Sequence, residues 1–138
     1  MKKRTLLLAA ASVVAITAVI GGEIVTSSGQ LCAAPNEPPT SFAEDILPLL
    51  KWRCGSCHQS GGAGYEKSGL DLSTYAGVMK GTKFGPMVIP RDPDSSNLML
   101  LLDWRVPAEL RMPHGKKKLS TCDRNAIRAW IREGAKNN

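Results

Sequence analysis

The segment RCGSCHQSGG, from Arg53 to Gly62, constrains the fold of this chain more than any other feature. Two residues separate Cys54 from Cys57, and His58 follows the second cysteine directly. Two thiols at this spacing on one turn of chain can each form a thioether with one of the two vinyl groups of a porphyrin, while the histidine reaches the iron. The spacing therefore predicts one covalently attached c-type haem per chain, with Cys54 and Cys57 as attachment sites and His58 as an iron ligand.

Two other interpretations of the same residues remain open. A zinc site could add His114 and Cys122 to the two cysteines, although the eight-residue separation of this pair is not that of a usual zinc knuckle. A redox-active dithiol of the thioredoxin type would need strands beside the motif. The sequence predicts no convincing strand, which disfavours the dithiol, and the spacing of His114 and Cys122 disfavours zinc. Both interpretations therefore fit the chain less well than haem attachment does.

The organisation of the 138 residues follows from their apolar and proline-rich stretches. The basic residues 2–4 precede an uncharged stretch from Thr5 to Gly22, a pattern typical of an export signal or a membrane anchor. We therefore expect a signal peptide or uncleaved membrane anchor over residues 1–29, a proline-containing linker over 30–40 and one folded domain over 41–138.

The export pattern and the charge indicate where the protein works and with what. We expect the domain on the periplasmic side of the bacterial inner membrane, either anchored through residues 5–25 or soluble after cleavage. The formal net charge is +6, but the basic residues are scattered and lack an interleaved aromatic stripe. Nucleic acid is therefore not an expected partner, whereas an acidic protein or a membrane surface is.

Capping residues and hydrophobic periodicity predict a domain made of helices. Ser41 and Glu44 form a capping box at the start of a first helix, which Pro48 should kink or divide. Ser120 and Asp123 open a last helix that should end at Gly134. Between them we expect helices over 73–80 and 97–104, a glycine-rich loop over 61–69, an extended segment over 85–93 and a loop over 106–119. Loops this long in a small domain indicate that something at its centre organises them.

The second axial position of the iron also has candidates. The methionines after the N-terminal segment are Met79, Met87, Met99 and Met112. Met112 stands out because polar residues surround it, Pro113 follows it, and 54 residues of chain after His58 suffice to reach the far face of the ring. We expect Met112 to be the ligand and the other three methionines to pack in the core, with His114 as the alternative ligand. His58 should donate its other ring N–H to a backbone carbonyl.

Five stretches of the chain occur in an order that is itself informative: FAEDILPLLKWRCGSCH, GLDLSTYAGVMKG, GPMVIPRDPDSSNLMLLL, RMPHGKKKLS and IRAWIREGA. Over nearly all of residues 41–135 they resemble the small class I c-type cytochrome domain family, in particular its planctomycete-type branch. The resemblance implies an all-α cytochrome c fold, in which the N- and C-terminal helices cross around one haem, here preceded by an apolar helix. It also implies covalent haem at Cys54 and Cys57, with His58 and Met112 as axial ligands.

The chain departs from the family pattern at two positions. His114 stands where a second proline usually follows the Met-Pro pair, so the loop around Met112 is expected to differ. Arg91 stands where a glycine commonly precedes the Asp-Pro pair. Its guanidinium either meets a haem propionate or is solvated.

The expected activity is electron transfer. With His58 and Met112 both bound, the iron keeps no open position, so we expect an electron carrier or a subunit of a membrane-associated redox complex rather than an enzyme. Arg111 and the lysines at 116–118 could steer an acidic redox partner, or they simply keep the loop solvated. A haem enzyme or gas sensor with an open sixth position is the alternative, and a structural subunit with an incidental haem is a third reading.

The remaining cysteines and the tryptophans also carry expectations. In an oxidising compartment, Cys32 and Cys122 could form a disulfide between the linker and the last helix. Otherwise they are a linker thiol and a small buried side chain. Trp130 is expected to pack against the first helix, and Trp52 and Trp104 to pack in the domain or against the porphyrin.

Overall fold

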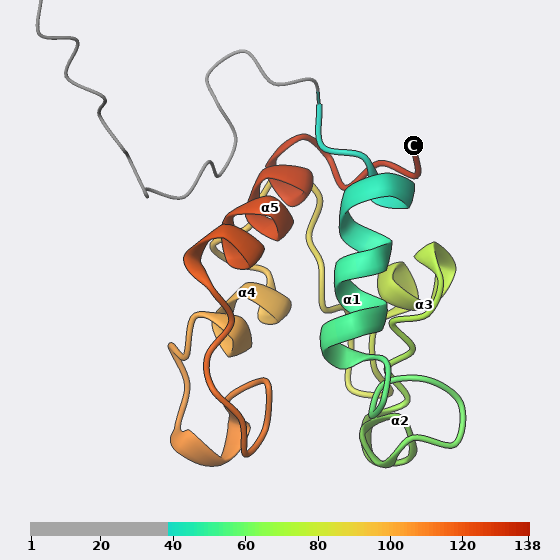
Figure 1. Cartoon of the computed structure of the whole chain (residues 1–138), viewed down its shortest axis with the longest axis vertical. Coiled ribbons are helices and arrows are strands. Elements are labelled where there is room, and N and C mark those ends of the chain that lie inside the picture. The colour runs from blue at the N-terminus through green and yellow to red at the C-terminus, as the bar shows by residue number, and fades with distance from the viewer. Residues whose placement is uncertain (1–38) are drawn as a thin grey trace, which may run out of the picture.

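The computed structural model describes residues 39–138 (Figure 1). The expected signal or anchor over 1–29 and most of the linker over 30–40 lie outside this range. Within it, one π-helical turn, five α-helices and one 3-10 turn follow each other: η1 Phe42–Ile46, α1 Leu47–Cys54, α2 Ala63–Ser68, α3 Tyr75–Lys80, α4 Asn97–Leu102, η2 Ala108–Leu110 and α5 Thr121–Arg132. Residues 39–138 contain no strand apart from an isolated bridge between Thr82 and Gly85. The predicted all-α class is confirmed for this part of the chain.

The first helix begins at the predicted cap but with a different winding. The hydroxyl of Ser41 accepts a hydrogen bond from the Glu44 N–H at 3.2 Å, as a capping box requires. The Ser41 N–H, however, donates to the Asp45 carboxylate at 2.8 Å instead of reaching Glu44. The partner lies one residue further on because the first turn is π-helical. Pro48 sits at the start of α1, so the predicted division is a change from π to α winding.

The last helix begins and ends as predicted. The Ser120 hydroxyl accepts a hydrogen bond from the Asp123 N–H at 3.0 Å, and Gly134, with φ of 106°, follows the helix end. One face of α5 is fully buried and carries Ile127, Trp130 and Ile131.

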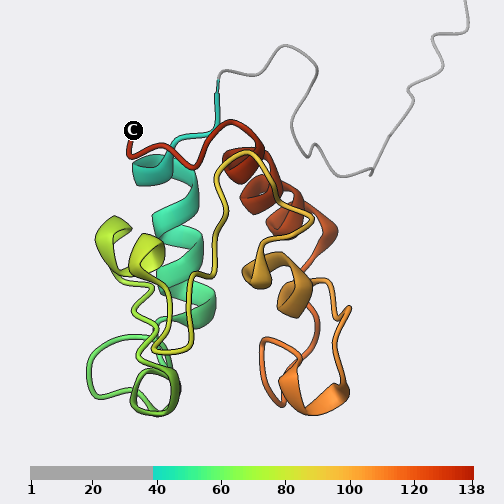
Figure 2. The same cartoon turned by 180° about the vertical axis from the view of Figure 1, so that it is seen from behind.

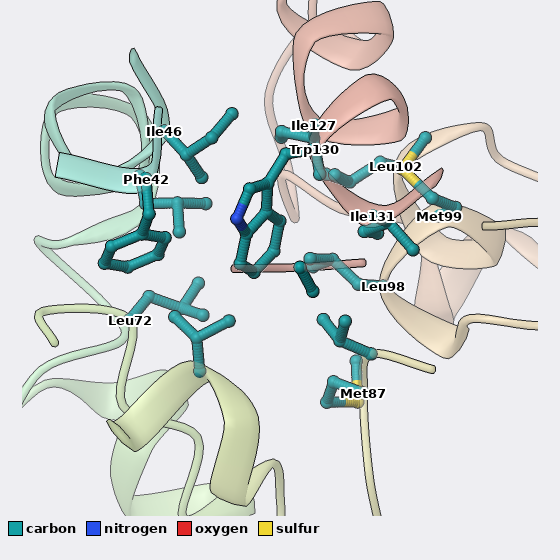
Figure 3. Packing of buried hydrophobic residues seen from close by; sticks show 14 of the residues in the cluster. Phe42, Ile46, Leu72, Met87, Leu98, Met99, Leu102, Ile127, Trp130 and Ile131 are labelled. Atoms are coloured by element: carbon teal, nitrogen blue, oxygen red, sulfur yellow. The ribbon is translucent and has the colours of Figure 1, made fainter. Parts of the chain in front are cut away.

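That face of α5 packs against the first helix to form the core (Figure 3). The ring centroids of Phe42 and Trp130 lie 5.3 Å apart, and Tyr75 meets Phe42 edge-on at 5.1 Å. Aromatic pairs at such separations contribute about 0.5–1.5 kcal/mol beyond their buried area. The expected packing of Trp130 against the first helix is therefore confirmed.

Two of the elements between these helices differ from the prediction. The glycine-rich passage over 61–69 was expected to be loop, but it contains α2, which Gly69 ends in a left-handed conformation with φ of 74°. The helix expected over 97–104 ends at Leu102, because Trp104 has a φ of 60° that no α-helix can continue. The segment 85–93, expected to be extended, is free of helix. In Figure 2 the chain between α3 and α4 runs between one side formed by α1, α2 and α3 and another formed by α4 and α5.

The two ends of the described chain are joined to each other. The Asn138 carbonyl accepts hydrogen bonds from the Ala43 N–H and the Ser41 hydroxyl, both at 2.9 Å. The Thr40 N–H donates to the Glu133 carboxylate at 2.8 Å. Figure 1 shows these ends at the top of the molecule, with α2 at the bottom. In the part of the chain described, no helix has both the length and the apolar character needed to cross a membrane.

Candidate functional site

One cavity brings the predicted site residues together. It has a volume of about 670 Å³, and Cys54, Cys57, His58 and Met112 all line it. The end of α1 and α2 line one side of the cavity, and α4 and the loop after it line the other. Figure 1 shows these two groups of elements facing each other across the molecule. Most of the lining is apolar, and the volume falls within the ~300–1,000 Å³ that small-molecule and cofactor sites occupy.

The backbone around the motif fixes how the cysteines and the histidine emerge. Helix α1 ends at Cys54, whose carbonyl accepts hydrogen bonds from the N–H groups of Cys57 and His58 at 3.0 and 2.9 Å. The Cys57 carbonyl in turn accepts from the Tyr65 N–H of α2 at 2.8 Å. The three side chains therefore leave one tight turn at a helix end, as the spacing predicted.

The Cys54 thiol does not have the character of the nucleophilic thiol of a redox dithiol. Burial raises the pKa of Cys54 from 9.0 to about 11, against the smaller lowering effects of Arg53 and Lys116. A nucleophilic dithiol needs at least one thiol with a lowered pKa. Cys54 instead remains a protonated thiol at neutral pH.

The zinc interpretation lacks its ligand set. No group of three or more His, Cys, Asp or Glu side chains gathers into a metal site within residues 39–138. Cys122 is disulfide-bonded, and its predicted partner Cys32 lies outside the described residues. Cys122 is therefore not a thiol that could join Cys54 and Cys57 around a metal.

His58 carries a buried nitrogen that the protein leaves unsatisfied. Its Nδ1 is inaccessible to solvent and has no hydrogen-bond partner. Burial lowers the pKa of the imidazole, while the backbone of Leu70 acts in the opposite direction without completing a hydrogen bond to Nδ1. The hydrogen bond expected from this nitrogen to a backbone carbonyl is therefore absent, and Leu70 supplies only the backbone group that raises the pKa of the imidazole. A neutral imidazole is the form that binds a metal, so His58 fits the role of an iron ligand.

The backbone of Gly64, in α2, packs directly against the same imidazole. A Cβ atom at this position would stand 2.7 Å from Cε1 and 2.9 Å from Nε2 of His58. At such distances a Cβ atom would overlap the imidazole ring, so glycine is the residue that fits beside it. The helix that the sequence did not predict therefore sets one boundary of the site.

Met112 approaches the cavity from the other side. It is half-buried, its N–H donates to the Leu101 carbonyl at 3.2 Å, and its own carbonyl accepts from the Trp104 indole N–H at 2.8 Å. His114, the alternative ligand, also lines the cavity.

The other methionines are placed mostly as expected. Met99 is fully buried and Met79 packs against the core, and neither lines the cavity. Met87 belongs to the core but also lines the cavity. Sequence reasoning missed its second contact because Met87 lies between prolines, where no periodicity shows which way a side chain points.

One expectation about a single residue was wrong. Trp52 does not pack in the domain, since its side chain is 78% exposed with the Arg53 guanidinium over its ring. Arg91 is exposed and does not line the cavity, as the solvated alternative for its side chain expects. Arg91 has a φ of 68°, a conformation that glycine adopts without strain and an arginine does not.

The rim of the cavity carries exposed apolar and basic side chains. Phe84 is 80% exposed and Leu110 is 51% exposed, and both border the cavity. Three basic residues border it too: Arg53, Lys67 and Lys116. Of the basic cluster expected near Met112, Lys116 thus reaches the cavity, whereas the Lys118 amine donates to the Asp103 carbonyl at 2.7 Å.

Comparison with known families finds a match. Residues 54–114 match the family described as Planctomycete cytochrome C, a range that begins at Cys54 and includes His58 and Met112. No curated protein and no solved structure matches the chain. A cytochrome c family domain implies covalently bound c-type haem and haem-based electron transfer. Residues 54–114 of this chain are thus a planctomycete-type cytochrome c domain.

Proposed function

We propose that this domain is a monohaem electron carrier, with haem attached at Cys54 and Cys57 and iron bound by His58 and Met112. The observation that carries the proposal is that these four residues line one largely apolar cavity, although the chain between the first and last of them contains three α-helices, one 3-10 turn and long loops. His58 lines this cavity, and burial favours the neutral form of its imidazole, which is the form that binds a metal ion. When bound, haem supplies a one-electron iron couple.

The protein's own groups define how such a couple would behave. The apolar lining excludes water from the site, and a thioether ligand raises the reduction potential relative to a second histidine. If His58 and Met112 both bound the iron, no position would be left on it for a substrate, so the domain would act as a carrier rather than an enzyme. We interpret the packing of η1 on α5 as the crossing of terminal helices in the cytochrome c fold.

The setting of the carrier follows from the same proposal. Covalent haem attachment belongs to exported proteins, and the basic and apolar N-terminal pattern supports the periplasmic side of the bacterial inner membrane. A redox protein or a membrane-associated redox complex would exchange electrons with it. The basic side chains at the rim favour an acidic surface on that partner.

Carbon monoxide binding tests the proposal. The full chain, produced with a c-type haem maturation system, is reduced with dithionite and its optical spectrum is recorded with and without the gas. We expect a covalent haem spectrum that carbon monoxide leaves unchanged. Rapid carbon monoxide binding would overturn the carrier assignment and favour a haem enzyme or gas sensor.

Three variants identify the sixth ligand in the same assay. Met112→Ala should open the iron to carbon monoxide, whereas His114→Ala and Met87→Leu should not. A closed site in Met112→Ala together with an open one in His114→Ala would transfer the ligand role to His114.

A further inference from the structure

We propose that Trp104 is a positioning residue that holds Met112 at the cavity through its indole N–H. This inference rests on the proposed role of Met112 as a ligand. Trp104 does not line the cavity itself, so it acts on the site through another residue.

Two hydrogen bonds hold the backbone of Met112 from both sides. The Trp104 Nε1–H donates to the Met112 carbonyl at 2.8 Å, and the Met112 N–H donates to the Leu101 carbonyl at 3.2 Å. Both partners lie at the C-terminal end of α4. Methionine has a flexible side chain, so fixing its backbone limits where its sulfur can reach.

Trp104 is itself held in a conformation that it would not adopt unaided. Its φ of 60° lies in the left-handed region, which is strained for a bulky residue. The Arg111 guanidinium and the Lys118 amine stand 5.4 and 5.7 Å from the centre of its ring. Arg111 and Lys118 lie on either side of Met112 in the sequence. Their contacts with the indole therefore hold both ends of the segment 111–118, which contains Met112.

The neighbouring Asp103 ties this arrangement to the core. Its carboxylate, only 8% exposed, pairs with Arg124 at 2.6 Å and with Arg128, both on α5. Its carbonyl accepts from the Lys118 amine at 2.7 Å. A continuous series of contacts therefore runs from α5 through Asp103 and Trp104 to Met112.

The experiment compares two tryptophan-to-phenylalanine variants of the haem-loaded full chain. Trp104→Phe keeps the ring and removes the N–H that binds Met112. Trp130→Phe is the matched control, because it removes an indole N–H that donates to the Lys136 carbonyl at the same distance of 2.8 Å. The main readout is the affinity of the oxidised protein for added imidazole, which competes for the sixth position of the iron.

We expect Trp104→Phe to bind imidazole about fivefold more tightly than wild type, the factor that one net hydrogen bond supplies, and Trp130→Phe to bind it as wild type does. The Met112 amide should also exchange its hydrogen faster in Trp104→Phe. Equal imidazole affinities in the two variants would overturn the positioning role. If wild type binds imidazole as tightly as Met112→Ala, the ligand assignment fails and this inference fails with it.

A measurement on the wild type keeps the test decisive if Trp104→Phe does not fold. The indole N–H of Trp104 should be protected from hydrogen exchange to a degree comparable with that of Trp130. The exposed Trp52 indole should exchange freely and serves as the reference. Free exchange at Trp104 would show that the bond to Met112 is absent.

Discussion

The imidazole of His58 rests against the backbone of Gly64, with room for a hydrogen atom on the glycine but not for a methyl group. The two residues belong to different elements, the turn after α1 and the helix α2. Their contact fixes the side of the cavity on which the imidazole stands.

Replacing Gly64 with alanine should therefore damage the site. Alanine favours a helix by about 0.5–1 kcal/mol over glycine, but forcing a methyl group into filled space costs about 1–3 kcal/mol, so the second effect wins. We expect Gly64→Ala to lower both the haem content per chain and the free energy of unfolding. Gly61→Ala is the control, because no atom lies within 4 Å of its added Cβ and the change is confined to a strained φ of 81°. Full haem content with raised stability in Gly64→Ala would contradict the contact.

Removing the cysteines tests covalent attachment. In the variant Cys54→Ala/Cys57→Ala, no thioether can form, so haem should separate from the chain under denaturing conditions, as followed by haem staining of a denaturing gel. Each single variant should keep one thioether and retain stain. Ser56→Ala, which changes an exposed residue between the two, should stain like wild type. Haem that stays with the denatured double variant would have to be attached elsewhere.

Glycine in place of Arg91 should stabilise the domain. The Arg91 N–H donates to the Ile131 carbonyl at 2.7 Å, so the backbone must keep its φ of 68° whatever the side chain. Relief of that strain is worth about 1–3 kcal/mol, and the extra freedom of glycine in the unfolded chain offsets about 0.5–1 kcal/mol of it. Denaturant unfolding should show a net gain of about 1 kcal/mol for Arg91→Gly. Arg91→Ala keeps a Cβ and should gain nothing, so equal stability of the two variants would locate the effect in the side chain.

Asp103 should make a large contribution to stability at neutral pH. Losing its charge leaves Arg124 and Arg128 without their carboxylate partner, and a charged hydrogen bond of this kind contributes about 1.5–3 kcal/mol. We expect Asp103→Asn to lower the free energy of unfolding by about 2 kcal/mol. Asp94→Asn is the matched control, because Asp94 is 82% exposed, pairs with Arg105 at 3.8 Å and should contribute less than about 0.5 kcal/mol. Similar losses in both variants would place Asp103 among ordinary surface charges.

The contribution of Asp103 should also depend on pH. Burial is the largest single influence and raises its pKa, but the hydrogen bonds from Arg124 and Arg128 together outweigh it, so the folded pKa lies below the ordinary 3.8. A lowered folded pKa means that the stabilisation is present above pH 3.8 and is lost as the pH falls through the folded value. Wild type should therefore lose more stability than Asp103→Asn when unfolding is measured on acidification below pH 3.8. Parallel pH profiles would assign the acid sensitivity to other groups.

Features encoded by neighbouring residues could be predicted from the sequence. The caps at Ser41 and Ser120 each depend on a partner three residues away, and both hydroxyls bind that partner. The turn that carries Cys54, Cys57 and His58 is equally local. For these features the chain itself sets the geometry, so a pattern of residue types is sufficient.

Features that depend on distant contacts could not be predicted in this way. Glycine has a poor helix propensity, so Gly64 indicated a loop, and only its packing against His58 accounts for a glycine inside α2. The role of Trp104 depends on a left-handed φ and on a carbonyl eight residues further along, neither of which leaves a periodic signal. The exposure of Trp52 could not be predicted either, because large aromatic side chains are usually buried and the sequence around Trp52 does not indicate otherwise.

The hydrogen bonds between Asn138 and residues 41–43 bring the two ends of the described chain together on the side of the domain away from α2 (Figure 1). Mechanical force applied to residues 40 and 138 would load those few bonds first, before the helices that border the cavity. Closely spaced ends also allow a domain to be spliced into a surface loop of another protein with short connectors. This domain is therefore suited to insertion into a surface loop of another protein, with α2 at the end far from the two connections.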